Sequence, residues 1–80
     1  MQEVILIING QTEKVKVSSV FCGRNPMTEQ CSVNIMDDDS GKQVRLFCED
    51  RKNYEEANTL VQKIHEGKIT DLTDYLAEWL

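Results

Sequence analysis

Several features are missing from this sequence, and each absence excludes a class of protein. No stretch approaches the ~18 consecutive apolar residues that a membrane-spanning helix needs. The first residues carry an acid, Glu3, where a secretory signal has positive charge, and the apolar run is five residues long, so we expect no signal peptide. The four glycines are scattered singly, which excludes a glycine-rich phosphate loop.

Cysteine and histidine are also scarce. Cys22, Cys31 and Cys48 form an odd set without a close pair, which favours a reducing cytoplasm over a disulfide-bonded secreted domain. Together with His65 they lack the short ligand spacings of zinc motifs. Cys31 and Cys48 alternate in phase with core positions and are expected to be small buried hydrophobes. Cys22 is the candidate nucleophile, with His65 as its base, but the two are distant in the sequence and nothing supplies an orienting third group. We therefore expect no metal, no cofactor and no enzymatic activity.

The composition is that of one small globular domain spanning residues 1–80, with 40% hydrophobic and 29% charged residues. The net charge is −5, and the excess is uneven: residues 49–80 carry 8 acids and 4 bases, against 6 acids and 5 bases in residues 1–48. Release of counterions from nucleic acid requires positive charge, so the net acidity of the whole molecule disfavours direct nucleic-acid binding. The acidity instead suits a partner with a basic surface.

The first part of the chain predicts four strands. Asn9-Gly10 follows a β-branched run and is a strong signal for a tight hairpin. The return strand alternates Val15 and Val17 with lysines, which is the pattern of a half-buried strand. The predicted strands are Val4–Ile8, Thr12–Phe21, Gln30–Met36 and Gln43–Glu49.

The last third predicts two helices. Asn53, or alternatively Asp50, is a good N-cap for the first, and Gly67 is a typical stop. A second helix begins at Thr70 or Asp71. Its predicted core face is Leu72, Tyr75, Leu76 and Trp79. The predicted fold is α+β, a four-stranded antiparallel β-meander followed by two short helices packed on one face (ββββαα).

Two surfaces follow from this layout. The helices are expected to cover the sheet face that carries Val4, Leu6, Val15, Val17, Val33, Val44 and Leu46. The opposite sheet face then displays Ile5, Ile7, Lys14, Lys16, Arg45 and Phe47. This face is either shielded by the lysine and arginine stems or a contact surface for a partner or a homodimer.

The second surface is acidic. At helical spacing, Asp71, Asp74 and Glu78 lie on one side and form a ridge. Asp37, Asp38 and Asp39 could suggest a calcium-binding loop, but the glycine and glutamate that such a loop requires are missing at the expected positions. We therefore expect these aspartates to form a polar hairpin tip. Both groups are candidate contacts for a basic partner.

We therefore expect a small, acidic, non-enzymatic protein-binding module. In size, charge and layout it resembles, in general character, the inhibitors encoded by phages and mobile elements, including anti-CRISPR proteins. That resemblance implies stoichiometric binding to a larger protein or ribonucleoprotein complex in the cytoplasm and steric blocking of a basic groove. The alternative is a single-stranded nucleic-acid-binding module that uses the exposed sheet face, with Lys14, Lys16, Arg45 and Phe47.

Overall fold

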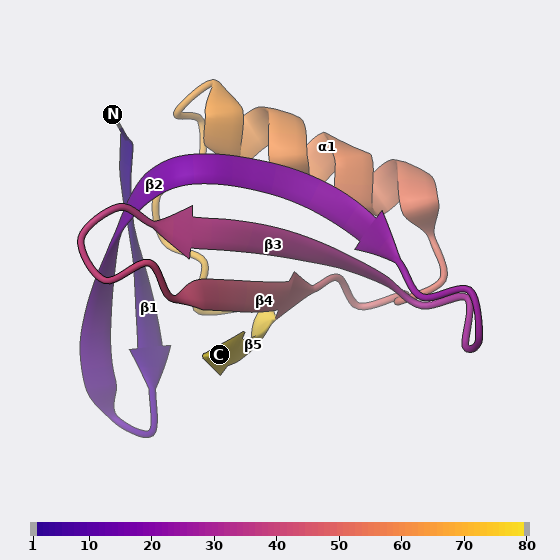
Figure 1. Ribbon diagram of the computed structural model, residues 1–80, viewed down its shortest axis with the longest axis horizontal. Coiled ribbons are helices and arrows are strands. Elements are labelled where there is room, and N and C mark those ends of the chain that lie inside the picture. Colours follow the sequence, from indigo (N-terminus) through magenta and orange to yellow (C-terminus); the bar gives the residue numbers. More distant parts are fainter. Residues whose placement is uncertain (1, 80) are drawn as a thin grey trace.

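A computed structural model describes residues 2–79 as one curled antiparallel sheet with a single α-helix among these residues (Figure 1). The strands follow one another in the sheet in the order β1-β2-β3-β4-β5. In chain order the elements are β1 (Gln2–Ile8), β2 (Gln11–Arg24), β3 (Cys31–Asp37), β4 (Gln43–Phe47), α1 (Tyr54–His65) and β5 (Leu76–Trp79). The predicted α+β class and the antiparallel meander are confirmed. The ββββαα layout is wrong, because β5 replaces the second helix.

The first hairpin forms where the sequence predicts it. Asn9 and Gly10 both have positive φ, at 52° and 78°, as a two-residue turn of this kind requires. Ile8 pairs with Gln11 on either side of the turn. The turn therefore fixes the register of β1 against β2.

Strand β2 is the long curved strand of Figure 1, and its two halves have different main partners. The first half pairs with β1, and the second half pairs with β3 after a register shift between Val17 and Ser19. Because side chains alternate with a period of two, one extra residue exchanges the two faces of the strand. Val20 consequently packs against the core, and Phe21 points to the other side.

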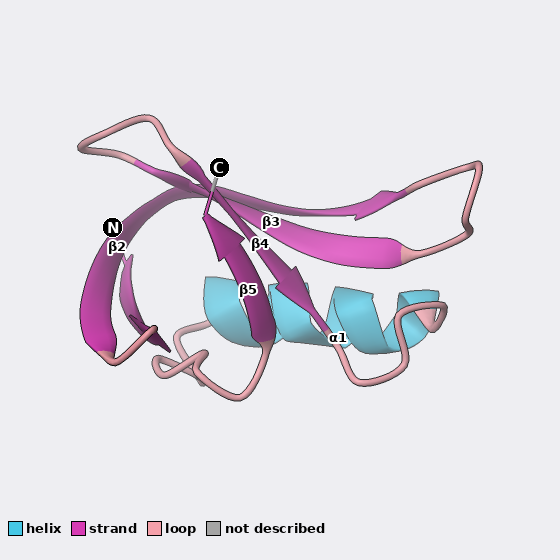
Figure 2. Cartoon of the chain, turned by 90° about the horizontal axis from the view of Figure 1, so that it is seen from below, coloured by secondary structure: helices cyan, strands magenta, loops and turns pink. Residues whose placement is uncertain are grey.

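Helix α1 covers one face of the sheet, as Figure 2 shows. The predicted N-cap is confirmed, since the Asn53 side chain accepts a hydrogen bond from the Glu56 backbone N–H at 3.1 Å. Gly67 follows the helix with φ +74°, a conformation that ends helices readily. The helix buries Ala57, Leu60 and Ile64 against the sheet.

The predicted core face of the sheet is largely confirmed. Val17 is only partly buried, whereas the other predicted members are at most 1% exposed. Those buried members are Val4, Leu6, Val15, Val33, Val44 and Leu46. Cys31 and Cys48 also lie in this core, as their phase predicts. Within residues 2–79, no helix is long and apolar enough to cross a membrane.

The predicted second helix is absent because its residues complete the sheet at both ends. The Thr70 carbonyl accepts from Ile5 N–H at 2.8 Å, and Leu72 N–H donates to the Ile5 carbonyl at 2.9 Å, so this segment lies along the free edge of β1. Farther on, β5 pairs with β4, with Trp79 opposite Val44. A helix this short has little stability of its own, whereas two open strand edges gain hydrogen bonds from an extended segment.

The face predicted for that helix is therefore only partly buried. Leu72 is fully buried, and Tyr75 and Trp79 pack against the core. Leu76 was expected on the same face but is 60% exposed. In β5 the core-facing positions alternate, so Ala77 and Trp79 point inward and Leu76 points outward.

Candidate binding cleft on the outer face of the sheet

The sheet face opposite α1 carries a row of side chains that crosses four strands. Register places Phe21 opposite Asn34, Asn34 opposite Arg45, and Arg45 opposite Glu78. Figure 2 shows the β2–β3 and β3–β4 connections bending away from α1, so they rise on the side of this row. On this face the side chains leave a hollow that is bounded by the β2–β3 connection.

This hollow is a cleft of about 690 Å³ that extends from the β2–β3 connection onto β4. We call it the outer cleft. It is lined by Phe21, Gly23, Arg24, Asn25, Pro26, Met27, Gln30, Ser32, Asn34, Gln43, Arg45 and Phe47. Among these described lining residues there is no lysine, aspartate or glutamate, although those three types dominate the charged residues of the chain.

Both phenylalanines and all three arginines of the chain gather at the outer cleft. Phe21, Phe47, Arg24 and Arg45 line it. Arg51 lies over the Phe47 ring, with its guanidinium carbon 4.1 Å from the ring centroid, a distance that suits cation–π attraction. The guanidinium therefore covers one face of the Phe47 ring, whereas Phe21 is 48% exposed.

The two lining arginines have acidic neighbours, but these contacts are loose. Arg45 Nη1 lies 3.4 Å from Glu78 Oε2, and Arg24 Nη2 lies 3.9 Å from Glu29 Oε1. More than a third of each of these side chains is exposed to solvent. Exposed ion pairs of this kind contribute at most about 1 kcal/mol, so both arginines remain accessible to a ligand.

The structure divides the sheet face that the sequence predicts as a contact surface. Arg45 and Phe47 lie in the outer cleft, but Ile5, Ile7, Lys14 and Lys16 lie on the β1–β2 hairpin and do not line it. On the hairpin, Ile5 faces Lys14 across the two strands. The Lys16 ammonium lies 3.4 Å from Asp39.

Arg45 and Phe47 are the cleft residues that the sequence predicts as exposed, and Phe21 and Asn34 are among those that it does not reveal. The alternation of Val15 and Val17, continued along β2, places Phe21 on the core side. Only the register shift after Val17 turns it outward. No local pattern marks that shift, because Ser18 and Ser19 are compatible with either face.

The candidate acidic residues do not form one helical ridge. Glu78 is on β5 beside Arg45, whereas Asp71 precedes β5 and holds a turn, since Thr73 N–H donates to its carboxylate at 2.9 Å. The Thr73 hydroxyl also bonds to this carboxylate, and these hydrogen bonds hold the pKa of Asp71 below its usual range. Asp74 is exposed in the same turn. Contact between these carboxylates and a partner stays a prediction.

The three aspartates of the β3–β4 turn have different environments. Asp37 is buried and accepts hydrogen bonds from the Ser40 hydroxyl at 2.7 Å and from Lys16 N–H at 3.0 Å. The Ser40 hydroxyl is the main reason why the pKa of Asp37 lies below its usual range. Asp37 therefore fixes the turn, and Asp38 and Asp39 are its exposed members.

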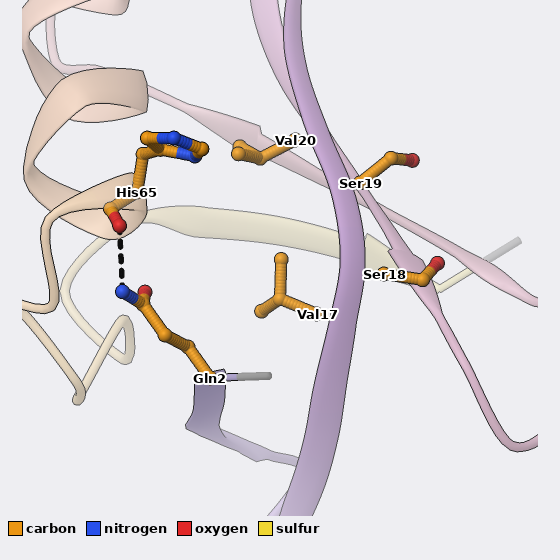
Figure 3. Close-up of a pocket in the computed structure, with 6 residues that line it drawn as sticks. All are labelled: Gln2, Val17, Ser18, Ser19, Val20 and His65. Atoms are coloured by element: carbon orange, nitrogen blue, oxygen red, sulfur yellow. Dashed lines mark hydrogen bonds between the residues drawn. The ribbon is translucent and has the colours of Figure 1, made fainter.

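A second, smaller pocket of about 380 Å³ lies between the end of α1 and β2 (Figure 3). His65 lines it together with Val17 and Val20, and Gln2 Nε2 donates to the His65 carbonyl at 2.6 Å. In Figure 3 the Ser18 and Ser19 side chains lie on the far side of β2 from His65. No nucleophile therefore faces the imidazole among the residues that line this pocket.

Cys22, the candidate nucleophile of the sequence, is not in that pocket. It is partly buried and packs against the core. Burial is the main cause that raises the pKa of its thiol, and the nearby Cys31 raises it further. An activated cysteine requires the opposite shift, so this environment suits a structural thiol.

Comparison with known protein families, with curated proteins and with solved structures finds no match to this chain.

Proposed function

We propose that this protein is a small, non-enzymatic binding module that makes stoichiometric contact with a partner protein through the outer cleft. One observation carries the proposal: both phenylalanines of the chain lie at one exposed, hollowed sheet face, together with Arg45 in the cleft lining and Arg51 over the Phe47 ring. Aromatic residues, arginine and methionine are enriched at the centre of protein interfaces, and lysine, aspartate and glutamate are depleted there. The cleft lining has this composition.

The apolar surface continues beyond the cleft. Leu76, which is 60% exposed, pairs across the sheet with Phe47, and Met27 is 90% exposed in the β2–β3 connection. Burying the exposed half of Phe21 contributes about 1 kcal/mol, because complete burial of such a side chain contributes roughly 1.5–3 kcal/mol. A typical interface takes about 800 Å² from each partner, which is roughly a seventh of the 5228 Å² surface of this protein.

The mode of action that we propose is steric. A domain of this size blocks whatever its partner binds at the covered surface, which is the inhibitory mode expected from the resemblance to phage-encoded inhibitors. The hydrogen bonds of Asp37 and Asp71 hold these two carboxylates within turns, which favours the outer cleft over the acidic groups as the main contact. Asp38 and Asp74 are exposed and do not line the outer cleft, so they are suitable acidic comparison positions.

Affinity capture with matched variants tests the proposal. Immobilised protein is incubated with a lysate of cells that express it, and the mass of the captured complex gives the stoichiometry. We expect Phe21→Ser and Arg45→Gln to lower partner recovery at least tenfold, and the charge reversals Asp38→Lys and Asp74→Lys to leave it within twofold. The reverse result would contradict the role of the cleft and support an acidic contact.

A single-stranded nucleic acid is the second candidate ligand. Phenylalanine rings stack on bases, arginines meet phosphates, and amides such as Asn34 and Gln43 can bond to base edges. Fluorescence anisotropy with labelled oligothymidylate and oligouridylate at low salt is the direct measurement. Binding that weakens steeply with salt and is lost in Arg45→Gln would support this function. Lys14→Glu/Lys16→Glu tests whether the hairpin contributes, and unchanged anisotropy at low salt would remove the candidate.

A further inference from the structure

We infer that the second half of β2 is an open strand edge that takes an extended, uncharged segment of another protein as an additional antiparallel strand beside α1. This inference concerns a different surface from the outer cleft and does not depend on the proposed function. It rests on the direction of the backbone groups of β2, on the side chains beside the edge and on the position of α1.

Strand β2 continues well beyond its first partner. Pairing with β1 ends where Gln2 lies opposite Val17, whereas β2 runs on to Arg24. On the side that β1 leaves free, no further strand of residues 2–79 pairs with β2. The second half of β2 is therefore an edge strand of the sheet on this side.

The outward backbone groups of this edge belong to Val20 and Cys22. Asn25 N–H donates to the Gln30 carbonyl at 2.8 Å where β2 and β3 meet their connection. Bonded pairs alternate with unbonded pairs along an antiparallel ladder, so Phe21, four residues before Asn25, also bonds to β3. Val20 and Cys22, on either side of Phe21, direct their N–H and C=O groups to the open side. No hydrogen bond within residues 2–79 engages these groups.

The pairing of β3 with β4 agrees with this direction. Asp37 N–H donates to the Lys42 carbonyl at 2.9 Å, and the same alternation turns the backbone groups of Ile35 toward β4. Val20 is opposite Ile35, so Val20 does not bond to β3, and Cys22 is in the same position two residues farther on. Two N–H donors and two carbonyl acceptors are thus left for another strand, which is the basis of recognition by strand addition.

One flank of α1 forms a wall beside the open edge. Residues three and four positions apart share one side of a helix, and the side that contains His65 lines the smaller pocket with Val17 and Val20. The same side of α1 carries Tyr54, Asn58, Val61 and His65. Val61 packs partly against the core, and Tyr54 is 47% exposed. A side chain of an added strand that points to the α1 side of the sheet therefore meets this flank.

The charge of this surface specifies an uncharged ligand. The chain has 14 acids and 9 bases, but β2 has neither from Val17 to Gly23, and the α1 flank has no acid, lysine or arginine. A charged ligand side chain that faced the flank would lose water without gaining an opposite charge. Valine suits these positions because β-branched residues favour extended strands. The pocket of about 380 Å³ beside His65 has room for one such side chain.

The position of α1 argues against a second copy of the chain at this edge. In Figure 1 α1 extends past β2 on the side away from β3, and Figure 2 shows it on one side of the sheet. Two copies joined edge to edge about a twofold axis would place both helices in the same space beside the joint. A single extended segment brings no helix with it. Its antiparallel direction matches the four strand pairs of the sheet.

Fluorescence anisotropy with backbone-methylated peptides tests the inference. The probe is a fluorescein-labelled heptapeptide of alternating threonine and valine, with valine at its second, fourth and sixth positions. Residues of a bonded antiparallel pair direct their side chains to the same face, so the valines that bond to Val20 and Cys22 also face α1. We expect N-methylation of the valine amides to weaken binding at least tenfold, and N-methylation of the inner threonine amides to leave it within threefold. Equal losses, a larger loss from threonine methylation, or no binding of the unmethylated probe would overturn the inference.

Amide hydrogen exchange, followed by NMR, locates the binding to the edge. In the free protein we expect the amide protons of Val20 and Cys22 to exchange at least tenfold faster than those of Phe21 and Gly23, which bond to β3. Saturation with the probe should slow exchange at Val20 and Cys22 at least tenfold. Equal protection of all four amides in the free protein, or no slowing at Val20 and Cys22 by the probe, would overturn the inference.

Two tryptophan variants test the wall that α1 provides. Asn58 is half-buried on the flank beside the edge, and its neighbour Thr59 is exposed. We expect Asn58→Trp to weaken probe binding at least fivefold, because the indole occupies the space of the ligand side chains, and Thr59→Trp to leave it within twofold. Urea unfolding checks that both variants are folded.

A change in the probe tests the charge of the groove. Glutamate in place of the central valine should weaken binding at least tenfold, whereas threonine at that position should weaken it less than the glutamate does. Equal affinity for the glutamate peptide and the probe, or equal effects of Asn58→Trp and Thr59→Trp, would overturn the inference.

Discussion

Leu72 and Leu76 allow a direct test of the path of the last segment. On a helix, residues four apart lie on the same face, so Leu72→Ala and Leu76→Ala should cost similar amounts of stability. In the structure Leu72 is fully buried, and Leu76 is 60% exposed. The two substitutions are identical in chemistry and differ only in the environment of the side chain.

The expected costs differ several-fold. A fully buried leucine replaced by alanine loses roughly 2–5 kcal/mol of folding free energy, and we expect about 3 kcal/mol for Leu72→Ala. Leu76→Ala removes mainly exposed surface and should stay within about 0.5 kcal/mol. Domains of this size have only about 4–12 kcal/mol of stability in total, so Leu72→Ala removes a large part of it.

Urea unfolding followed by circular dichroism and Trp79 fluorescence measures both costs. The slope of the unfolding free energy against urea concentration should be the same in the wild type and in both variants. Changes in the midpoint then report changes in stability. Losses within about 0.5 kcal/mol of each other, or a loss above about 1.5 kcal/mol for Leu76→Ala, would refute the β5 arrangement. Either result would favour a helix over residues 71–80.

Three further predictions follow from local contacts. Asn53→Ala should cost about 1 kcal/mol in urea unfolding, because Glu56 N–H loses its capping acceptor, and Asn53→Asp should retain most of the stability. Hydrogen bonds to the Asp37 carboxylate, mainly the one from the Ser40 hydroxyl, lower the pKa of Asp37 in the folded state. The stability that this carboxylate adds to the fold is therefore complete above its unfolded pKa of about 4. That stability is lost as the pH falls through the lower folded pKa. Melting temperatures between neutral and acid pH should fall less steeply for Asp37→Asn, and equal slopes would contradict this. Burial raises the pKa of the Cys22 thiol, so alkylation by iodoacetamide at mildly alkaline pH should be slower in the native protein than in urea, and equal rates would show an exposed thiol.

The strand and helix patterns of residues 4–67 are strong because each depends on local chemistry. Asn9-Gly10 tolerates the positive φ of its turn, alternation sets the core face of β1, β3 and β4, and Asn53 and Gly67 bound the helix. These features need no knowledge of distant residues. They account for most of the sheet and for the position of α1.

The last segment is different, because its pattern fits two periods. Leu72, Tyr75, Leu76 and Trp79 fit a helix face, but Tyr75, Ala77 and Trp79 fit equally well the alternation of a strand. Short apolar runs of this kind are ambiguous between the two structures. The open edges of β1 and β4 decide between them, and those edges exist only once the sheet has formed.

The outer cleft depends on tertiary structure in the same way. The sequence alone identifies Arg45 and Phe47 as exposed sheet residues, and it fixes the charge and the absence of familiar motifs. It does not place Phe21 beside them, because one extra residue after Val17 exchanges the faces of β2. Periodicity determines which side chains can share a face, whereas strand pairing determines which ones do.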